Sequence, residues 1–194
     1  FRDLKPENLL LNTEGHVKLT DMGLAKVCLG KTYTTCGTPD YFAPELIASK
    51  GHSHAVDWWT LGILTFELLS GHPPFESPSP MQTYMKVNKG IGKIRFPKKV
   101  QGDVESLIKG LCSSSPSERL PMKKGDTRNI KDHPWFAGFD WDAMANLRME
   151  PPYTPSVKNN KDAGNFSVRK EDMPPQILYK DDGSGWDQDF ATCK

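Results

Sequence analysis

The first eight residues carry the side chains that a phosphoryl transfer would require. Asp3 could orient and deprotonate an acceptor hydroxyl. Asn8 follows five residues later and could give magnesium an oxygen ligand from the same loop. Lys5 lies between them and could neutralise a transferring phosphoryl group. A charged surface turn is the alternative for Asp-Leu-Lys alone, but the complete segment Arg-Asp-Leu-Lys-Pro-Glu-Asn favours the catalytic interpretation.

A further carboxylate, Asp21, begins an Asp-Met-Gly tripeptide thirteen residues after Asn8. Together with Asn8 it could chelate a magnesium ion that bridges nucleotide phosphates, while Gly23 would let the backbone adjust. In isolation this tripeptide would be an ordinary turn. Its position directly after two short apolar runs favours the metal-binding interpretation.

Several elements must position these side chains. Two apolar runs flank a turn that ends in Gly15, which predicts a hairpin. Apolar residues recur at helical spacing from His54 to Ser70, and Gly71 with two prolines should end that helix. The expected segments are strands at 9–11 and 17–19, an ordered loop at 27–44, and helices at 54–70, 81–87 and 104–112.

The composition is that of a globular protein. The 194 residues are 37% hydrophobic and 25% charged, with a formal net charge of +1. This charge gives no reason to expect a nucleic acid as a partner. The four cysteines show no CxxC spacing, which disfavours a zinc site or disulfide framework and favours a reducing, cytoplasmic location. The most apolar stretch, residues 61–69, is too short to span a membrane.

A third motif, Gly-Thr-Pro-Asp-Tyr-Phe-Ala-Pro-Glu at residues 37–45, completes a set. In order and spacing, the three motifs resemble those of protein kinases over residues 1–136. The resemblance implies the C-terminal lobe of the kinase fold, mainly α with a small β-hairpin. Residues 137–194 would then form a separate C-terminal tail.

The resemblance assigns roles to the residues of the motifs. Asp3 becomes the catalytic base, Lys5 the lysine on the phosphate side, and Asn8 and Asp21 the magnesium ligands. Thr38 would tie Asp3 to Lys5, which argues for a serine/threonine kinase. The expected cofactors are ATP and Mg²⁺, and the residues expected to hold them are Lys5, Glu7, Asn8, Asp21 and Phe166.

Two structural contacts also follow from the resemblance. Glu45 should form a buried ion pair with Arg119, the alternative being two surface charges that contribute little. Asp57, in an Asp-Trp-Trp segment, should anchor the backbone of the catalytic loop.

Regulation is implied at Thr34, two residues before Cys36. Kinases of this type carry their activating phosphate there, and Arg2 and Lys26 would bind it. Thr32 and Thr35 are neighbours, so the choice of Thr34 depends on register, and a plain solvated threonine is the alternative.

Acidic residues predict a preference for basic substrates. Glu67 lies in an otherwise apolar helix, where an unpaired charge is costly, so a cationic substrate side chain would explain it. A rim position solvated by water is the alternative. The predicted substrate-binding residues are Glu7, Pro39, Asp40, Phe42 and Glu67.

The tail resembles that of the AGC kinases. Its closing Gly-Trp-Asp-Gln-Asp-Phe, at residues 185–190, is most similar to the cyclic-GMP-dependent group. Phe166 would approach the nucleotide, while Trp186 and Phe190 would pack on an N-terminal lobe.

The chain opens within the first motif and contains no glycine-rich phosphate loop, strand lysine or adenine hinge. We therefore expect a kinase fragment without its N-terminal lobe, inactive by itself. Its partners would be protein or peptide substrates with upstream Arg or Lys, and a cyclic-nucleotide-binding region preceding it. The alternatives are a noncatalytic pseudokinase or truncated binding module, or another AGC kinase such as the cyclic-AMP-dependent type.

Overall fold

The computed structural model describes residues 1–166, 178, 180 and 183–185. The chain divides into two units, Phe1–Pro155 and Ser156–Lys194. Within the described residues the first unit is mostly helical with one two-stranded sheet, which confirms the predicted fold class. The two units meet after Pro155. The predicted change from kinase lobe to tail after residue 136 stays a prediction.

The hairpin directly follows residues 2–8, the segment that carries the predicted catalytic residues. Strands β1 (Leu9–Leu11) and β2 (Val17–Leu19) pair antiparallel, with Leu9 opposite Leu19. The side-chain oxygen of Asn12 accepts hydrogen bonds from the main-chain nitrogens of Glu14 and His16, which closes the turn. This hairpin is the one that the two apolar runs predicted.

Helix α2 (Ala55–Ser70) is the centre of the first unit. Val56, Trp59, Ile63 and Phe66 are all at most 1% exposed, at the spacing of one helical face. The helix ends where Gly71 adopts a left-handed conformation (φ 94°) and its nitrogen donates to the carbonyl of Glu67. The predicted range 54–70 is thus correct to one residue.

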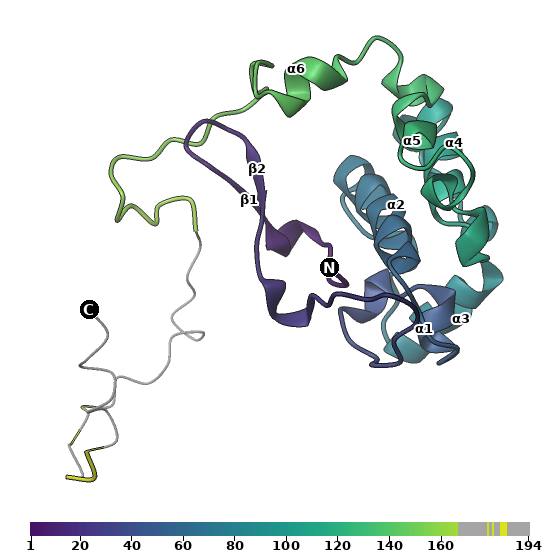
Figure 1. The fold of residues 1–194 in the computed structure, drawn as a ribbon, viewed down its shortest axis with the longest axis horizontal. Coiled ribbons are helices and arrows are strands. Elements are labelled where there is room, and N and C mark those ends of the chain that lie inside the picture. Colours follow the sequence, from purple (N-terminus) through teal and green to yellow (C-terminus); the bar gives the residue numbers. More distant parts are fainter. Residues whose placement is uncertain (167–177, 179, 181–182, 186–194) are drawn as a thin grey trace. The chain divides into compact units, whose positions relative to one another are not determined.

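Other helices surround α2 (Figure 1). Helix α4 packs along α2, and α1 packs against α3. Proline at the first position starts both α1 and α3, where its missing N–H costs no hydrogen bond. The remaining α-helices are α1 (Pro44–Ile47), α3 (Pro80–Lys89), α4 (Asp103–Leu111), α5 (Arg128–Lys131) and α6 (Trp141–Ala145).

Short 3-10 helices occupy much of the connecting chain. They are η1 (Pro6–Asn8), η2 (Met22–Leu24), η3 (Pro39–Tyr41), η4 (Ile91–Lys93), η5 (Lys98–Val100), η6 (Pro116–Glu118), η7 (Leu120–Met122) and η8 (Pro134–Phe136).

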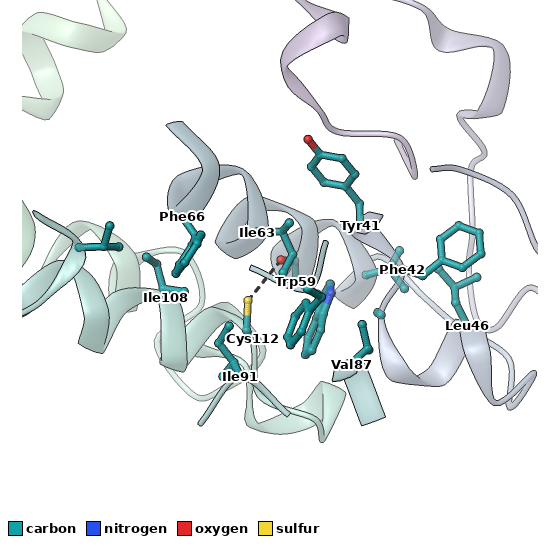
Figure 2. Close-up of a cluster of buried hydrophobic side chains, with 14 of the residues drawn as sticks. Tyr41, Phe42, Leu46, Trp59, Ile63, Phe66, Val87, Ile91, Ile108 and Cys112 are labelled. Carbon is teal, nitrogen blue, oxygen red and sulfur yellow. Dashed lines mark hydrogen bonds between the residues drawn. The ribbon is translucent and has the colours of Figure 1, made fainter. Parts of the chain in front are cut away.

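The core forms around α2 (Figure 2). Trp59 stacks on Phe75 with ring centroids 5.8 Å apart, and Phe66 meets the ring of Phe96 edge-on. Cys112 donates its thiol hydrogen to the carbonyl of Trp59 at 3.6 Å, which fastens the end of α4 to α2. No helix among the described residues has the length and apolar character needed to cross a membrane.

Candidate active site

Asp3, Lys5 and Thr38 form one hydrogen-bonded cluster. The Thr38 hydroxyl donates to Asp3 Oδ1 at 3.0 Å and accepts from Lys5 Nζ at 2.9 Å. Lys5 Nζ also lies 3.0 Å from Asp3 Oδ2. Because Thr38 is distant in sequence, this contact fixes the loop before α1 against the loop before η1. These are the three residues that sequence analysis had grouped together.

Asn8 belongs to the same cluster and is buried. Its Nδ2 donates to the main-chain oxygen of Asp3 at 2.8 Å and to Asp3 Oδ2 at 3.1 Å. Because both bonds use the amide nitrogen, they orient the side chain so that Oδ1 remains as the group available to a cation.

Thr20, the residue before Asp21, is hydrogen-bonded to Asn8. The nitrogen and the hydroxyl of Thr20 both donate to the main-chain oxygen of Asn8, at 2.9 and 3.2 Å. Asp21 is exposed, has φ 59° and accepts from the nitrogen of Gly23. A carboxylate and an amide oxygen on adjoining segments fit magnesium, which prefers a few protein oxygens together with phosphates and water. The described residues contain no group of three or more His, Cys, Asp and Glu placed to hold a metal.

Asp57 anchors the first residues of the chain to α2. Its two carboxylate oxygens accept from the main-chain nitrogens of Phe1, at 3.0 Å, and Arg2, at 2.8 Å. Gly37 approaches the same segment closely: a Cβ on it would lie 2.9 Å from the carbonyl oxygen of Arg2. With φ 107°, position 37 suits only glycine, so the two loops can meet there.

The predicted ion pair between Glu45 and Arg119 is present in the structure. Two parallel hydrogen bonds of 2.7 Å join the guanidinium to the carboxylate, and Arg119 is fully buried. Arg119 also donates to the carbonyls of Ala55 and Ser113, at 2.7 and 3.1 Å. Its position over the ring of Trp59, 5.4 Å from the centroid, connects the pair to the core.

Acidic residues gather around Tyr41. Its hydroxyl donates a hydrogen bond to Glu67, and Glu7 and Asp40 act on it electrostatically. Burial, then the bond to Glu67, raise the pKa of the Tyr41 hydroxyl well above its usual range, so it stays a donor. Among the described residues no cationic side chain pairs with these three carboxylates. Glu67 therefore has a neutral partner, which the sequence did not indicate.

Arg2 and Lys26 both line a small cavity, whereas Thr34 is exposed and is not among the lining residues. Arg2 Nε donates to the carbonyl of Leu24 at 2.7 Å, and Lys26 Nζ donates to the Thr32 hydroxyl at 3.1 Å. His52 also lines this cavity, and sequence analysis missed it. Its main chain pairs with that of Thr32 in an isolated antiparallel bridge, for which no local pattern exists.

Three predicted residues remain to be placed. Pro39 starts η3, and Phe42 is buried and stacks on Tyr84 with centroids 6.0 Å apart. Phe166 lies in the second unit and is exposed. Their roles at substrate and nucleotide stay predictions. Trp186 and Phe190 lie outside the described residues.

Comparison with known proteins agrees with this geometry. The model of the family described as "Protein kinase domain" matches residues 1–136. A cyclic-GMP-dependent protein kinase of Drosophila melanogaster, isozyme 1, is 49% identical over 98% of this chain and 25% of its own length. Isozyme 2 forms cD5/T2 from the same fly is 48% identical over 98% of this chain and 20% of its own length.

A human relative, the cAMP-dependent protein kinase catalytic subunit PRKX, is 47% identical over 88% of this chain and 47% of its own length. The chain thus spans about a fifth to a half of the length of the curated relatives named here. With its motifs, the Asp3 cluster and these similarities together, the chain belongs to the protein kinase family, in the neighbourhood of the cyclic-nucleotide-dependent AGC members.

Proposed function

We propose that this chain provides the catalytic base, the magnesium ligands and the peptide-binding surface of a serine/threonine protein kinase of the cyclic-GMP-dependent type. The observation that carries the proposal is the shared hydrogen-bond cluster of Asp3, Lys5, Asn8 and Thr38. A charged surface turn has no reason to place four polar side chains in mutual contact across 35 residues of sequence.

In this proposal Asp3 orients the acceptor hydroxyl and takes its proton as the γ-phosphoryl group of ATP is transferred. Thr38 and Asn8 hold one carboxylate oxygen each, which limits rotation of the group. Lys5, held by both Asp3 and Thr38, places its ammonium charge where phosphoryl oxygens would arrive. Positioning and charge are the main contributions that a protein makes to this reaction.

Asn8 and Asp21 would hold Mg²⁺, which when bound bridges the nucleotide phosphates and neutralises their charge. The bonds from Asn8 Nδ2 to Asp3 leave the amide oxygen for this task. The left-handed backbone of Asp21 and the turn at Gly23 present its carboxylate at the surface. Phe166 is proposed to cover the nucleotide.

Substrates with Arg or Lys before the acceptor would suit the carboxylates around Tyr41. Glu7, Asp40 and Glu67 create a negative region that nothing cationic in the described chain neutralises. A guanidinium would gain charge-assisted hydrogen bonds there. Pro39 and Phe42 would contact the substrate beside the acceptor. Thr34 is proposed to carry an activating phosphate held by Arg2 and Lys26, and a cyclic-nucleotide-binding region would regulate the protein from the N-terminal side.

The experiment fuses this chain to the N-terminal half of the kinase domain of the Drosophila isozyme 1 relative, because the 194 residues contain no glycine-rich loop. Phosphate transfer to an arginine-containing peptide is measured for the fusion, for Asp3→Asn and for Asp103→Asn. Asp103 begins α4 outside the site and serves as the matched control. Asp3→Asn should lower kcat by about a hundred- to ten-thousandfold without weakening Mg-ATP binding.

A noncatalytic binding module is the competing function. It predicts that the unmodified fusion and Asp3→Asn are equally inactive although both bind the peptide. It also predicts that Asp21→Asn leaves Mg-ATP affinity unchanged, whereas the kinase proposal expects this variant to lose most of it. Near-normal transfer by Asp3→Asn would exclude Asp3 as the base.

A further inference from the structure

A cavity of about 80 Å³ lies beside the catalytic segment. It has room for more than one water-sized group. Its walls come from the start of the chain, from the loop after η2 and from the segment preceding α2. The lining residues named in the argument are Arg2, Lys26, Cys28, Thr32, His52 and Asp57.

Two of the residues that line this cavity each have a buried polar atom without a hydrogen-bond partner. His52 is 4% exposed and its Nε2 makes no hydrogen bond, and the same holds for the buried Nη1 of Arg2. Only Trp59 Nε1 shares this condition among the described residues, so two of the three such atoms belong to residues that line one cavity. Leaving a buried donor unpaired costs about 1–3 kcal/mol, which an acceptor entering the cavity would recover.

We propose that His52 is the third ligand of a phosphate on Thr34, beside Arg2 and Lys26, and that it makes docking of this phosphate depend on pH. The proposal rests on the proposed role of Thr34. Two hydrogen bonds of 2.9 Å join the main chains of His52 and Thr32, two residues before Thr34. Two residues span at most roughly 7 Å, so a phosphate on Thr34 lies within reach of the cavity that Thr32 lines.

The charges around His52 decide its protonation. Burial first, and then the nearby Arg2, hold the pKa of the His52 imidazole below its ordinary value, so without an anion it is neutral near pH 7. The charged groups that act on it are Arg2 and Lys26, which disfavour the imidazolium, and Glu45 and Asp57, which favour it; Cys28 and His54 also line the cavity.

A phosphate dianion in the cavity would reverse this balance, because an opposite charge in contact favours the imidazolium. Docking and protonation then strengthen each other by linkage. The contribution of His52 is lost as the pH rises through its raised pKa. Below about pH 6 the phosphate itself becomes a monoanion, so docking should be strongest in a narrow range around neutrality.

The test follows the NMR titration of the ¹³C-labelled histidines in the whole chain, with either threonine or genetically incorporated phosphothreonine at position 34. We expect the His52 midpoint to move from below 6.5 without phosphate to above 6.5 with it. The exposed His72, which does not line the cavity, serves as the control signal. An unchanged His52 midpoint overturns the proposal, and no variant is needed for this result.

A second measurement tests separately whether the Thr34 phosphate docks in this cavity and whether His52 is one of its ligands. The ³¹P shift of the phosphothreonine is followed against pH in His52→Gln, Arg2→Gln and the control His72→Gln. Both His52→Gln and Arg2→Gln should move the phosphate titration towards that of a free peptide. A response to Arg2→Gln alone refutes His52 as a ligand while leaving the Thr34 site intact. No response to either variant refutes docking of the phosphate in this cavity, and with it the proposed role of Thr34.

Discussion

Among the described residues, the fully buried Arg119 and the partly buried Arg2 differ in how many partners their guanidinium groups have. The guanidinium of Arg119 makes four hydrogen bonds: two to the carboxylate of Glu45, and one each to the carbonyls of Ala55 and Ser113. The guanidinium of Arg2 has one hydrogen-bond partner, the carbonyl of Leu24, and its buried Nη1 has none. A guanidinium with all its partners in place stabilises the fold, whereas an unpaired buried donor leaves a hydrogen bond that an acceptor could still make.

The difference follows from what each arginine connects. Arg119 connects Glu45 in α1 with the first residue of α2 and with Ser113, which follows α4. Its side chain is fully buried, so no ligand can reach it. Arg2 lies at an open cavity whose other cation, Lys26, is exposed. Substitutions that break the two sites separately should therefore change the free energy of unfolding by very different amounts.

The largest expected effect is that of Glu45→Ala. It leaves the Arg119 charge buried without its carboxylate, and removing one partner of a buried pair costs about 3–5 kcal/mol. Urea denaturation of the chain measures the free energy of unfolding. The matched control is Glu118→Ala, which breaks an exposed pair with Lys123 and should change little. A loss no larger for Glu45→Ala than for the control would mean that the pair is not structural.

Arg2→Gln should have a smaller effect that depends on Thr34. Without phosphate the variant loses one hydrogen bond to the carbonyl of Leu24, worth about 0.5–1.5 kcal/mol. With phosphothreonine at position 34 it should lose about 1.5–3 kcal/mol more, because a charge-assisted bond disappears as well. The quantity to compare is the loss of unfolding free energy caused by Arg2→Gln, measured once with threonine and once with phosphothreonine at position 34. Equal losses in both forms would make Arg2 a structural arginine like Arg119.

His52 should give the unphosphorylated chain a distinctive pH dependence. Because its folded pKa is lowered, the unfolded chain binds a proton that the folded chain does not, and stability falls as the pH drops below about 6.5. One such group contributes at most about 1.4 kcal/mol per pH unit. Thermal melts of the parent and His52→Gln between pH 7.5 and 5.5 should show a shallower slope for the variant. Parallel slopes would mean that His52 does not titrate differently in the fold.

The smallest expected effect is that of Glu105→Gln on α4. Its carboxylate pairs with Lys109 one helical turn away at 2.6 Å, with both side chains partly exposed. Such a pair stabilises by about 0.3–0.5 kcal/mol and is screened by salt. Melts at low and high ionic strength should show this difference fading. If the loss of stability in Glu105→Gln persisted at high ionic strength, the pair would be a structural one like that of Arg119, contrary to this expectation.

Sequence reasoning found those parts whose signals are local. Apolar spacing along α2 gave its range to within one residue, and the turn at Asn12 gave the hairpin, because in both the neighbouring residues determine the structure. The motif around Asp3 is local too, since Asn8 lies five residues away. Helices of four or five residues, such as α1 and α6, are too short to show a period and were missed.

Contacts between distant segments came only through resemblance, or not at all. Arg119 lies 74 residues from Glu45, and no rule of spacing joins them. His52 and the hydrogen bond from Tyr41 to Glu67 were missed because each depends on packing of segments that the sequence does not place. A histidine or tyrosine in an unremarkable stretch carries no sign of its neighbours.

Arg2 and Asp3 are consecutive, yet Arg2 lines the cavity while Asp3 belongs to the catalytic cluster. Arg2 has φ 76°, and its nitrogen is fixed by Asp57. Since adjacent Cα atoms are about 3.8 Å apart, the two sites share one peptide plane. An anion held by the Arg2 side chain would therefore lie one rigid peptide unit away from the residue proposed as the base, so a change in the Arg2 backbone would pass to Asp3 without crossing the core.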